Sequence, residues 1–559
     1  MLMKAKRAAP AAATTYSRAA GTARRSEIII VFAIFALVTV ALWFSAPHDG
    51  EFWWSDSPRH ALNGVFLNDM LAAFPWHAPA RYAMQYYVQY PALTILFYPP
   101  LFYVLSIPFY ALFGVSHGTA LAVVLLHYLA LAFGLFLLAR RWLAWPVALA
   151  VGLAALLAPG IALWGRQVML EIPALAFAVW ALLLLRRHAE TAKPALLYLG
   201  LFLLLCAIYT KITLVFLAPV AALMLWVAEG SAVLRQRHNW IAALAFLIGL
   251  IPVAVLTLKF GAANVQSVVG IADAEVSRRS LAGWLWYARQ LPDQLGWALL
   301  FAALLAPLLA LAGRRPQGFG RTDLALLGGW FVIGYIFFSL IDLKEARHST
   351  AILPPLLIAA GLALQQLRFA AAPLALLLAL GTGLYTWRYA PVPQVAGYRQ
   401  AALWMVHNAP KGSVILFSGK RDGSFIFNLR SLDPHRDYYV VRSDKLLLEV
   451  AVRRELGVTE KSLSEAQIGD LLDRDGIRYV VAQSDFWTDL DEMARLQDVL
   501  RSDHFVEVAR IPVIANVPVE DRELRIYRNQ HKVTPTANPL VLDLPIIGRS
   551  VEGETGGSH

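Results

Sequence analysis

The sequence is poor in charged residues and has almost no cysteine. Asp, Glu, Lys and Arg make up 16% of its 559 residues, whereas soluble globular proteins carry roughly 25%. The single cysteine, Cys206, stands within an apolar run, which excludes a disulfide framework and a thiolate metal site, and we expect it to be a small buried hydrophobe. A repeat of fixed period is also absent from the sequence. Much of the chain therefore lies outside the composition of soluble proteins.

Apolar residues are what the chain has in excess. They make up 58% of the sequence, and several runs approach or reach the ~20 residues that are needed to cross ~30 Å of hydrocarbon. A soluble core does not need so many such runs, whereas a bilayer does. Clear examples are Ile28–Leu42, Ala120–Ala139, Ala144–Leu157, Ile241–Leu256 and Leu299–Leu311.

The net charge of +11 is a signal of topology rather than of nucleic-acid binding. Many basic residues stand in short loops between apolar runs, and such loops mark the cytoplasmic side of a membrane. No motif of a nucleic-acid-binding module occurs in the sequence. We therefore predict that the chain has the lipid bilayer, and no nucleic acid, as a partner.

The first 26 residues are basic and contain no acidic residue. The apolar run that follows ends at Trp43 and Phe44 without the prompt small-residue cleavage site of a signal peptide. We expect residues 1–26 to form a disordered cytoplasmic tail and the helix after it to be retained. The positive charges of the tail are Lys4, Lys6, Arg7, Arg18, Arg24 and Arg25.

The segment Phe97–Phe113 decides how the chain is threaded through the membrane. It is apolar enough to cross, but a crossing would place Arg140, Arg141 and the basic group at 186–193 outside. Its prolines and tyrosines suit a helix that lies along the interface, and we predict this arrangement. About eleven spans result, at 27–45, 119–139, 143–160, 172–187, 194–209, 212–228, 240–258, 294–313, 323–341, 349–366 and 370–388.

The eleven spans predict a multi-pass protein of the cell (inner) membrane. Because their number is odd, the N-terminus is expected to be cytoplasmic and the C-terminus extracytoplasmic or periplasmic. The transmembrane domain covers residues 27–390. It includes two long outer loops, 47–118 and 259–293, and loops of this length are usually functional.

From residue 391 onward the composition changes. Helical patterns alternate with short β-type runs over residues 391–531, which predicts an extracytoplasmic α/β domain. No glycine-rich phosphate loop stands between a strand and a helix there. We expect the C-terminal tail, 532–559, to be poorly ordered, apart from Pro539–Ile547, which could pack against the rest.

Ionisable side chains gather at the outer ends of the predicted helices. A charged residue at the centre of a membrane helix costs roughly 2.5–3.5 kcal/mol by insertion scales, so such residues indicate function. Each has an ordinary explanation: Asp56 and Glu171 can cap helices, Lys211 can snorkel, and Arg347 can pair with an acidic residue two or five positions before it. Together they form a site of two carboxylates and several cations, which suits a substrate that carries phosphate. The residues are Asp56, Arg59, His60, Arg166, Glu171, Lys211, Lys344, Arg347 and His348.

Five short motifs in these segments follow one another in a defined order. They are an acid soon after the first span, a Pro-Pro-Leu sequence, an Arg-x-x-Met sequence followed by an acid, a Thr-Lys pair, and a basic segment that leads to Leu-Pro. In this order they resemble the GT-C superfamily of membrane glycosyltransferases, and within it the family-39-like group of protein O-mannosyltransferases and lipid A aminoarabinose transferases. The matching residues are Asp56, Arg59, His60, Pro99, Pro100, Leu101, Arg166, Met169, Glu171, Thr210, Lys211, Lys344, Arg347, His348, Leu353 and Pro354.

The resemblance covers roughly residues 27–390, and the chain departs from it at three positions. Ser57 stands where many relatives have a second carboxylate, and Tyr98 stands where they have Lys or His before Pro-Pro. Glu171 replaces the commoner Asp.

The resemblance implies that the protein transfers a sugar from a polyprenyl-phosphate carrier to a lipid, glycan or protein acceptor at the outer face of the membrane. Asp56 would be the base for the acceptor hydroxyl, and Glu171 would position the acceptor or the sugar. A divalent metal ion is a candidate cofactor, with Asp56 and Glu171 as its ligands. Cations would stabilise the charge that develops on the donor phosphate, and those implied are Arg59, His60, Arg166, Lys211, Lys344, Arg347 and His348.

Aromatic residues of the first outer loop could stack on sugar rings, or could form an interfacial aromatic belt. They are Trp53, Trp54, Tyr86, Tyr87 and Tyr98.

Two other classes of function are alternatives. A transporter or flippase for a lipid-linked saccharide would favour charges near the bilayer midplane and repeat-related broken helices. A sensor or assembly protein would use the membrane part only as an anchor, which does not require eleven spans.

Overall fold

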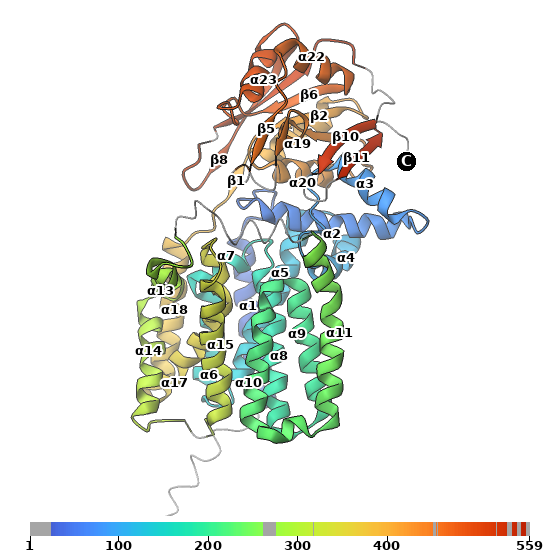
Figure 1. The fold of residues 1–559 in the computed structure, drawn as a ribbon. Coiled ribbons are helices and arrows are strands. Elements are labelled where there is room, and N and C mark those ends of the chain that lie inside the picture. The colour runs from blue at the N-terminus through green and yellow to red at the C-terminus, as the bar shows by residue number, and fades with distance from the viewer. Residues whose placement is uncertain are drawn as a thin grey trace, which may run out of the picture.

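The computed structural model describes residues 24–260, 276–316, 318–450, 454, 457–520, 522–533, 539–544 and 549–554. The predicted disordered tail, up to residue 23, and the 261–275 part of the second outer loop lie outside these ranges. The described chain forms a bundle of long helices with an α/β domain over one end, which we call the domain end (Figure 1).

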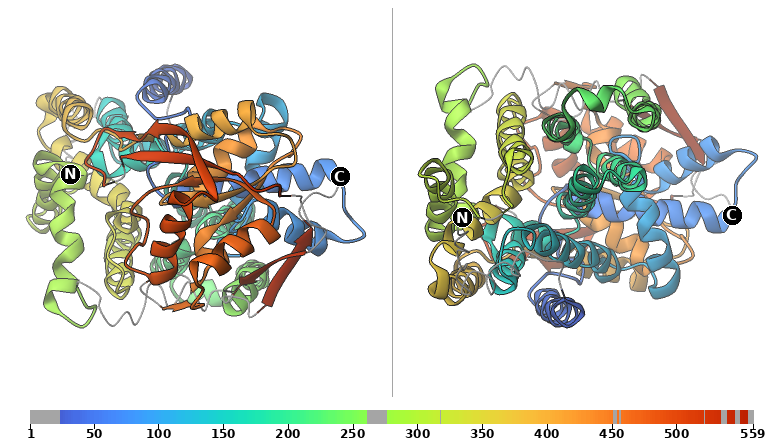
Figure 2. Two further views of the ribbon diagram at one scale, coloured as in Figure 1. Left: turned by 90° about the horizontal axis from the view of Figure 1, so that it is seen from above. Right: turned by 90° about the horizontal axis from the view of Figure 1, so that it is seen from below.

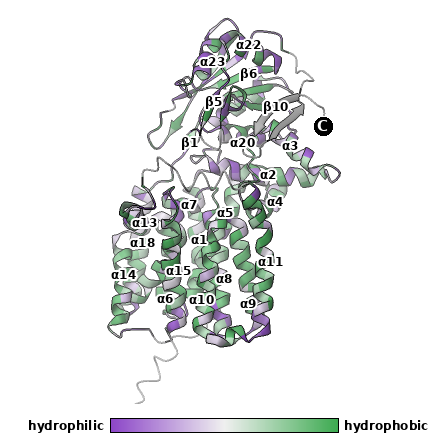
Figure 3. Cartoon of the chain, viewed as in Figure 1, coloured by the Kyte–Doolittle hydropathy of each residue, from purple (hydrophilic) through white to green (hydrophobic). Residues whose placement is uncertain are grey.

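The bundle consists of apolar helices, which are green in Figure 3. Within the described residues, eight helical segments are long and apolar enough to cross a membrane, and a ninth is a helix pair bent by 60°. The bend lies at Pro159, because proline lacks the N–H that would continue the first helix. Five of the eight segments are single helices: α1 (Arg25–Phe44), α5 (His117–Ala139), α8 (Glu171–Thr191), α11 (Arg237–Phe260) and α15 (Arg321–Ser339). The other three combine shorter helices: Ile212–Leu234 contains η1 (Ile212–Phe216), α10 (Leu217–Glu229) and η2 (Gly230–Leu234); Ala346–Gln365 contains α16 (Ala346–Ser349), η3 (Thr350–Ile352) and α17 (Leu353–Gln365); and Arg368–Tyr389 contains η4 (Arg368–Ala370) and α18 (Ala371–Tyr389). The bent pair is α6 (Trp145–Leu157) and α7 (Pro159–Gly165).

Two shorter apolar helices, α9 (Pro194–Thr210) and α14 (Trp297–Leu311), occupy the two remaining predicted ranges. Each of the eleven predicted spans therefore coincides with a helical segment. The prediction of a many-helix membrane fold is confirmed.

The helices differ in how far the rest of the protein covers them. The most apolar part of α1 is 17% buried, whereas that of the segment ending with α17 is 89% buried. Seen along the bundle axis, α1 lies at the edge (Figure 2). The apolar side chains that α1 leaves exposed are those that a bilayer would cover.

The segment between α1 and α5 stays at the domain end. At the opposite end of the bundle, Arg140 after α5 pairs with Glu27 of α1, with Nη2 and Oε2 3.3 Å apart. At the domain end, Gly118 lies against Trp43 and His48. The helix α4 (Leu101–Phe113) therefore begins and ends at the same end of the bundle, as a helix along the interface would.

The described parts of the two predicted outer loops contain helices besides the predicted interfacial helix α4. The first contains α2 (Asp56–Ala73) and α3 (Pro79–Gln89), and the described part of the second contains α13 (Leu281–Leu295). Figure 1 shows α2 lying across the domain end, between the bundle and the α/β domain. Asp56 and Pro58 stand in its first turn, where acidic residues and proline are favoured.

The predicted α/β domain is present. Five of its described strands form a sheet of order β3-β2-β6-β9-β7, in which β3, β2 and β6 are parallel and β9 and β7 are added antiparallel, and the pairs β1-β8 and β4-β5 form separate two-stranded sheets. Its elements are β1 (Val395–Ala396), α19 (Tyr398–Asn408), β2 (Val414–Ser418), α20 (Asp422–Leu432), β3 (Tyr439–Arg442), α21 (Ser443–Leu446), β4 (Leu448–Val450), β5 (Val458–Glu460), α22 (Glu465–Arg474), β6 (Ile477–Ala482), α23 (Asp491–Arg501), β7 (Phe505–Pro512), β8 (Ile514–Ala515) and β9 (Glu523–Asn529).

The two faces of this sheet belong to different cores, as the alternation of side chains along a strand requires. Ile415 and Phe417 join the apolar cluster that contains α19, α20 and the helix bundle. Val414 and Leu416 join a second cluster with α22 and α23. The core of the bundle therefore continues into the lower half of the domain.

The described part of the C-terminal tail includes much of Pro539–Ile547, the stretch that could pack against the rest. Residues 539–544 and 549–554 form an antiparallel hairpin of β10 (Pro539–Leu544) and β11 (Arg549–Glu554). The hairpin lies beside α3 (Figure 1). The strand β10 pairs with β11, and a search for isolated apolar runs in the sequence does not reveal such a pairing.

Candidate functional site

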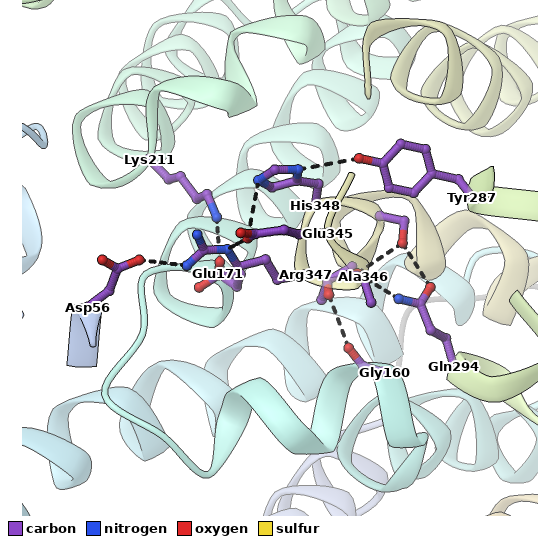
Figure 4. Close-up of polar contacts among 12 residues, drawn as sticks. Asp56, Gly160, Glu171, Lys211, Tyr287, Gln294, Glu345, Ala346, Arg347 and His348 are labelled. Atoms are coloured by element: carbon purple, nitrogen blue, oxygen red, sulfur yellow. Dashed lines mark hydrogen bonds and ion pairs between the residues drawn. The ribbon is translucent and has the colours of Figure 1, made fainter. Parts of the chain in front are cut away.

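Charged side chains from four separate segments converge at the domain end of the bundle. Arg347 donates from Nη1 to Oδ2 of Asp56 over 2.8 Å and also pairs with Glu345. Lys211 donates from Nζ to Oε1 of Glu171 over 2.5 Å. Figure 4 shows the guanidinium of Arg347 between Asp56 and Glu345, with the Lys211–Glu171 pair beside it. We call these five residues the charged cluster.

Breaks in the helices place these side chains. Glu171 is the first residue of α8, where the helix dipole favours a negative charge. Lys211 follows the end of α9 in an extended conformation, before the chain turns into a 3₁₀ helix. Arg347 stands in the one-turn helix α16. Each residue is therefore at the end of an apolar helix, where its charge can reach the same level as the others.

The charged cluster has three carboxylates and only two cations. Its side chains are largely buried, with exposed fractions from 4% for Glu171 to 31% for Glu345. Burial alone would raise the pKa of Asp56, but the positive charge of Arg347, with smaller contributions from His60 and Arg59, lowers it to about 2. Asp56 is thus a stable anion while Arg347 is paired with it.

Three polar atoms near Asp56 and Glu171 lack hydrogen-bond partners among the described residues. They are Oε2 of Glu171, Nε1 of Trp54 and Oγ of Ser57, all of which are buried. Buried polar atoms are nearly always paired in folded proteins, so each of these atoms is able to bind a ligand or a water molecule.

Neutral side chains support the charged cluster. His60 is buried and accepts or donates a hydrogen bond at 2.9 Å to the hydroxyl of Tyr103, while Tyr98 meets its ring edge to face. Burial lowers the pKa of His60 to about 4 despite the nearby carboxylate of Asp56. His348 lies 3.3 Å from the hydroxyl of Tyr287. His60 is therefore a neutral neighbour of the charged cluster at pH 7.

Three of the predicted phosphate-binding cations have other partners. Arg59 turns away from the charged cluster and binds both carboxylate oxygens of Asp422 in the α/β domain, at 3.0 and 2.8 Å. Arg166 donates to the backbone oxygens of residues 162 and 390. Lys344 donates to carbonyls at the end of α15, including that of Ser339 at 2.7 Å. Asp422 lies 363 residues from Arg59 and could not be found from the spacing of the sequence, whereas the partners of Lys344 lie close to it along the chain.

The aromatic residues are also divided. Tyr98 lies near the charged cluster against His60, and Trp54 packs on Trp164. Trp53 faces the guanidinium of Arg421 in the α/β domain. The remaining two lie at the interface with that domain: Tyr86 donates to Asp69, and Tyr87 packs partly against its second core.

Besides Asp56, Arg347 pairs with one of the two acids considered from the sequence. It is Glu345, which was given no site role, whereas Asp342 pairs with Arg278. Its position two residues before Arg347 was the available signal. Nothing in the sequence pointed to Asp422, which binds Arg59, or to Tyr287, which contacts His348.

The predicted metal ligands are held by cations of the protein. Asp56 binds Arg347 and Glu171 binds Lys211. Within the described residues, the group of three ligand-type side chains that lies close enough to share an ion is elsewhere, at Asp473, His504 and His531.

Comparisons with known proteins agree with this architecture. Residues 98–256, which include Glu171 and Lys211, match the sequence model of the dolichyl-phosphate-mannose-protein mannosyltransferase family. A search of curated proteins gave no match.

Among solved structures, ArnT from Cupriavidus metallidurans bound to undecaprenyl phosphate matches with a TM-score of 0.59 at 16% identity, over 92% of this chain and 100% of that one. The arabinofuranosyltransferase AftD from Mycobacteria matches with a TM-score of 0.56 at 17% identity, over 94% of this chain but only 41% of its own. The Archaeoglobus fulgidus oligosaccharyltransferase matches with a TM-score of 0.50 at 14% identity, over 83% and 70%. The chain has the fold of the GT-C membrane glycosyltransferases.

Proposed function

We propose that the protein is a membrane glycosyltransferase that moves a sugar from a polyprenyl-phosphate donor to a lipid, glycan or protein acceptor. The observation that carries this proposal is the convergence of Asp56, Glu171, Lys211 and Arg347 at one end of the bundle. The undecaprenyl phosphate bound to the structurally similar ArnT supports the choice of donor.

The reaction requires a group that stabilises the leaving phosphate. The acceptor oxygen attacks C1 of the sugar, the bond between C1 and the phosphate oxygen breaks, and polyprenyl phosphate leaves with the electron pair. Lys211 and Arg347 would bind the phosphate and stabilise its growing charge, which is worth most in a largely buried site. The apolar bundle would cover the lipid tail.

The acceptor hydroxyl must lose its proton, and Asp56 is the base that we propose. While it pairs with Arg347, its pKa is about 2, which makes it a poor base. A donor phosphate would draw Arg347 away, and burial would then raise the pKa of Asp56. Donor binding would thus strengthen the base before the acceptor reacts.

Glu171 would position the acceptor or the sugar. Its Oε1 is held by Lys211, while its buried Oε2 has no partner among the described residues and can accept a hydrogen bond from a sugar hydroxyl. A divalent ion bound by Asp56 and Glu171 would have to displace Arg347 and Lys211. The addition of EDTA to the turnover assay, followed by Mg²⁺ or Mn²⁺, decides whether the reaction uses one.

We further propose that the domain end lies outside the cell (inner) membrane and the N-terminus inside. The opposite end of the bundle holds Arg140, Arg141 and Arg186, and arginine in short loops marks the cytoplasmic side. The lipid donor would enter from the bilayer and the acceptor from the outer side. Reporter fusions after Gly114 and after Ala390 test this: a cytoplasmic signal from either contradicts it.

The function is tested with purified protein and labelled undecaprenyl-phosphate sugars, with a cell-envelope fraction as the source of acceptor. A glycosyltransferase releases undecaprenyl phosphate and labels the acceptor. A flippase in proteoliposomes would instead move the donor across the membrane intact. Transport without cleavage would therefore replace this proposal by the alternative.

A further inference from the structure

Three side chains of the kinds that ligate metals meet in the α/β domain, next to α22 on the side away from the bundle (Figure 1). Asp473 comes from α22, His504 from the turn before β7, and His531 from the chain just after β9. Nε2 of His504 lies 2.9 Å from Oδ1 of Asp473, and Nδ1 of His531 lies 2.6 Å from its Oδ2. One ring nitrogen of each histidine therefore faces a different oxygen of the same carboxylate.

The surroundings hold these groups in place. Asn529 is buried and donates from Nδ2 to Oδ1 of Asp473 over 2.7 Å and to the carbonyl of Ile477 over 3.1 Å. The ring of His504 packs against Gly469, where a Cβ would come within 3.2 Å of it. Residues that orient a ligand carboxylate in this way are typical of built metal sites.

We propose that Asp473, His504 and His531 bind one divalent transition-metal ion of the Zn²⁺ class. Two imidazole nitrogens and a carboxylate oxygen are a ligand set that Zn²⁺ favours, and a fourth, open position would be taken by water. The ligand atoms lie within 4.8 Å of one another, whereas tetrahedral ligands at ~2.0–2.1 Å from zinc are about 3.3 Å apart. Small side-chain rotations bring the ligand atoms from the spacing in the structure to the tetrahedral spacing.

The same atoms can form hydrogen bonds in the absence of metal, with both rings donating to Asp473. When the metal binds, these two nitrogen atoms lose the protons of the N–H···O hydrogen bonds and donate their lone pairs to the ion. The ring protons then sit on Nδ1 of His504 and Nε2 of His531, the nitrogens that face away from Asp473. The ion would fasten the end of β9 to α22 and so stabilise the domain, independently of the glycosyltransferase proposal.

The experiment uses the full chain, purified in detergent without an oligohistidine tag and stripped with EDTA. Isothermal titration with ZnCl₂ should show one ion per chain, and Co²⁺ should give the visible absorption of a tetrahedral nitrogen–oxygen site. The double variant His504→Ala/His531→Ala should lose this binding by at least ~100-fold, and Asn529→Ala should weaken it by ~10–100-fold. The melting temperature should rise with Zn²⁺ in the wild type only.

The matched control is His407→Ala, because His407 is exposed and bonds only within its own helix α19, to the carbonyl of Leu403. It should bind Zn²⁺ like the wild type. Asp473→Asn provides a second test if the double variant does not fold in EDTA, since the amide keeps the side-chain shape but is a poor ligand. The proposal is wrong if the wild type binds less than one ion, or if the ligand variants bind it as tightly as the control.

Discussion

Asp56 and Arg59 stand less than one turn apart on α2, yet they belong to two different groups of charges. Asp56 is part of the charged cluster of the bundle, with Glu171, Lys211, Glu345 and Arg347. Arg59 is part of what we call the docking cluster, in which Asp422 bridges Arg59 and Arg442, at 2.8 and 3.0 Å, and Arg442 also binds Asp444 at 2.6 Å.

The two groups differ in balance rather than in burial. The docking cluster has two arginines and two aspartates, and its pairs are closed by several hydrogen bonds. The charged cluster has three carboxylates for two cations and a buried oxygen of Glu171 without a partner among the described residues. The docking cluster is complete within the protein, whereas the charged cluster keeps an acceptor oxygen on Glu171 for a hydroxyl of a ligand.

The docking cluster also differs from the charged cluster in lying at a closely packed contact between two domains. A Cβ on Gly423, at the start of α20, would lie 2.8 Å from Nη1 of Arg59 and 3.1 Å from Cγ of Pro58. The glycine therefore lets the α/β domain approach α2 directly. This contact fits a permanent joint between two domains.

The largest effect is expected for Asp56→Asn. Loss of a general base lowers turnover by about 10²–10⁴-fold, while the asparagine keeps the shape of the side chain. Release of undecaprenyl phosphate from a labelled donor measures the turnover. Binding of undecaprenyl phosphate by the same variant should stay within a few-fold of the wild type; a loss of binding as large as the loss of turnover would contradict the role of base.

The next effect is expected for Arg347→Ala and Lys211→Ala. Each should lower turnover by about 10²–10³-fold, as the loss of one charge-stabilising donor does, and should weaken binding of undecaprenyl phosphate relative to undecaprenol. Equal affinity of wild type and both variants for the phosphorylated lipid would show that the charged cluster does not hold the phosphate.

The pH dependence distinguishes Arg347 from Lys211. With Arg347 in place, the pKa of Asp56 is about 2, so free Asp56 is ionised throughout the usual range. Without Arg347, burial dominates and the pKa rises. Because the base must be ionised, the residual turnover of Arg347→Ala should fall at a higher pH on the acid side than that of Lys211→Ala. Identical acid limbs in kcat/KM would contradict the coupling.

A different kind of effect is expected for Asp422→Asn in the docking cluster. It leaves two buried arginines short of a counter-charge, and breaking a buried pair costs about 3–5 kcal/mol. The melting temperature should fall and proteolysis between the bundle and the domain should speed up, with a smaller change in turnover at low temperature. A variant with normal stability and abolished turnover would place Asp422 in the chemistry instead.

The smallest effect is expected for Lys344→Ala. Its ammonium binds carbonyls at the end of α15, so its loss should cost about 1 kcal/mol of stability and change turnover less than ~3-fold. This variant also serves as the control for Lys211→Ala. A loss of donor binding would restore Lys344 as a phosphate ligand.

The sequence revealed the charges that break apolar runs and missed those that do not. Lys211 interrupts about 30 mostly apolar residues, so its cost in a membrane points to it directly. Asp422 stands in an ordinary amphipathic sequence, and its partner Arg59 is 363 residues away. That pairing is set by the docking of two domains, which local spacing does not encode.

The same distinction holds for the fold. The eleven apolar ranges are visible because a bilayer requires long uninterrupted hydrophobic segments. By contrast, α2 and α13 mix polar and apolar residues and sit on the bundle, so neither stands out as a span. The short β-type runs Val414–Phe417, Tyr438–Val441, Tyr479–Val481 and Val506–Ile511 indicate β2, β3, β6 and β7, whereas β9 has charged residues between its apolar ones and does not stand out.

The most direct measurement of the central proposal compares donor cleavage by the wild type and by Asp56→Asn under identical binding of the donor. The wild type should release undecaprenyl phosphate from its sugar donor in the presence of acceptor, and Asp56→Asn should bind the lipid but release none above background. Full turnover by Asp56→Asn would contradict the account, because the carboxylate at the centre of the charged cluster would then have no part in the reaction.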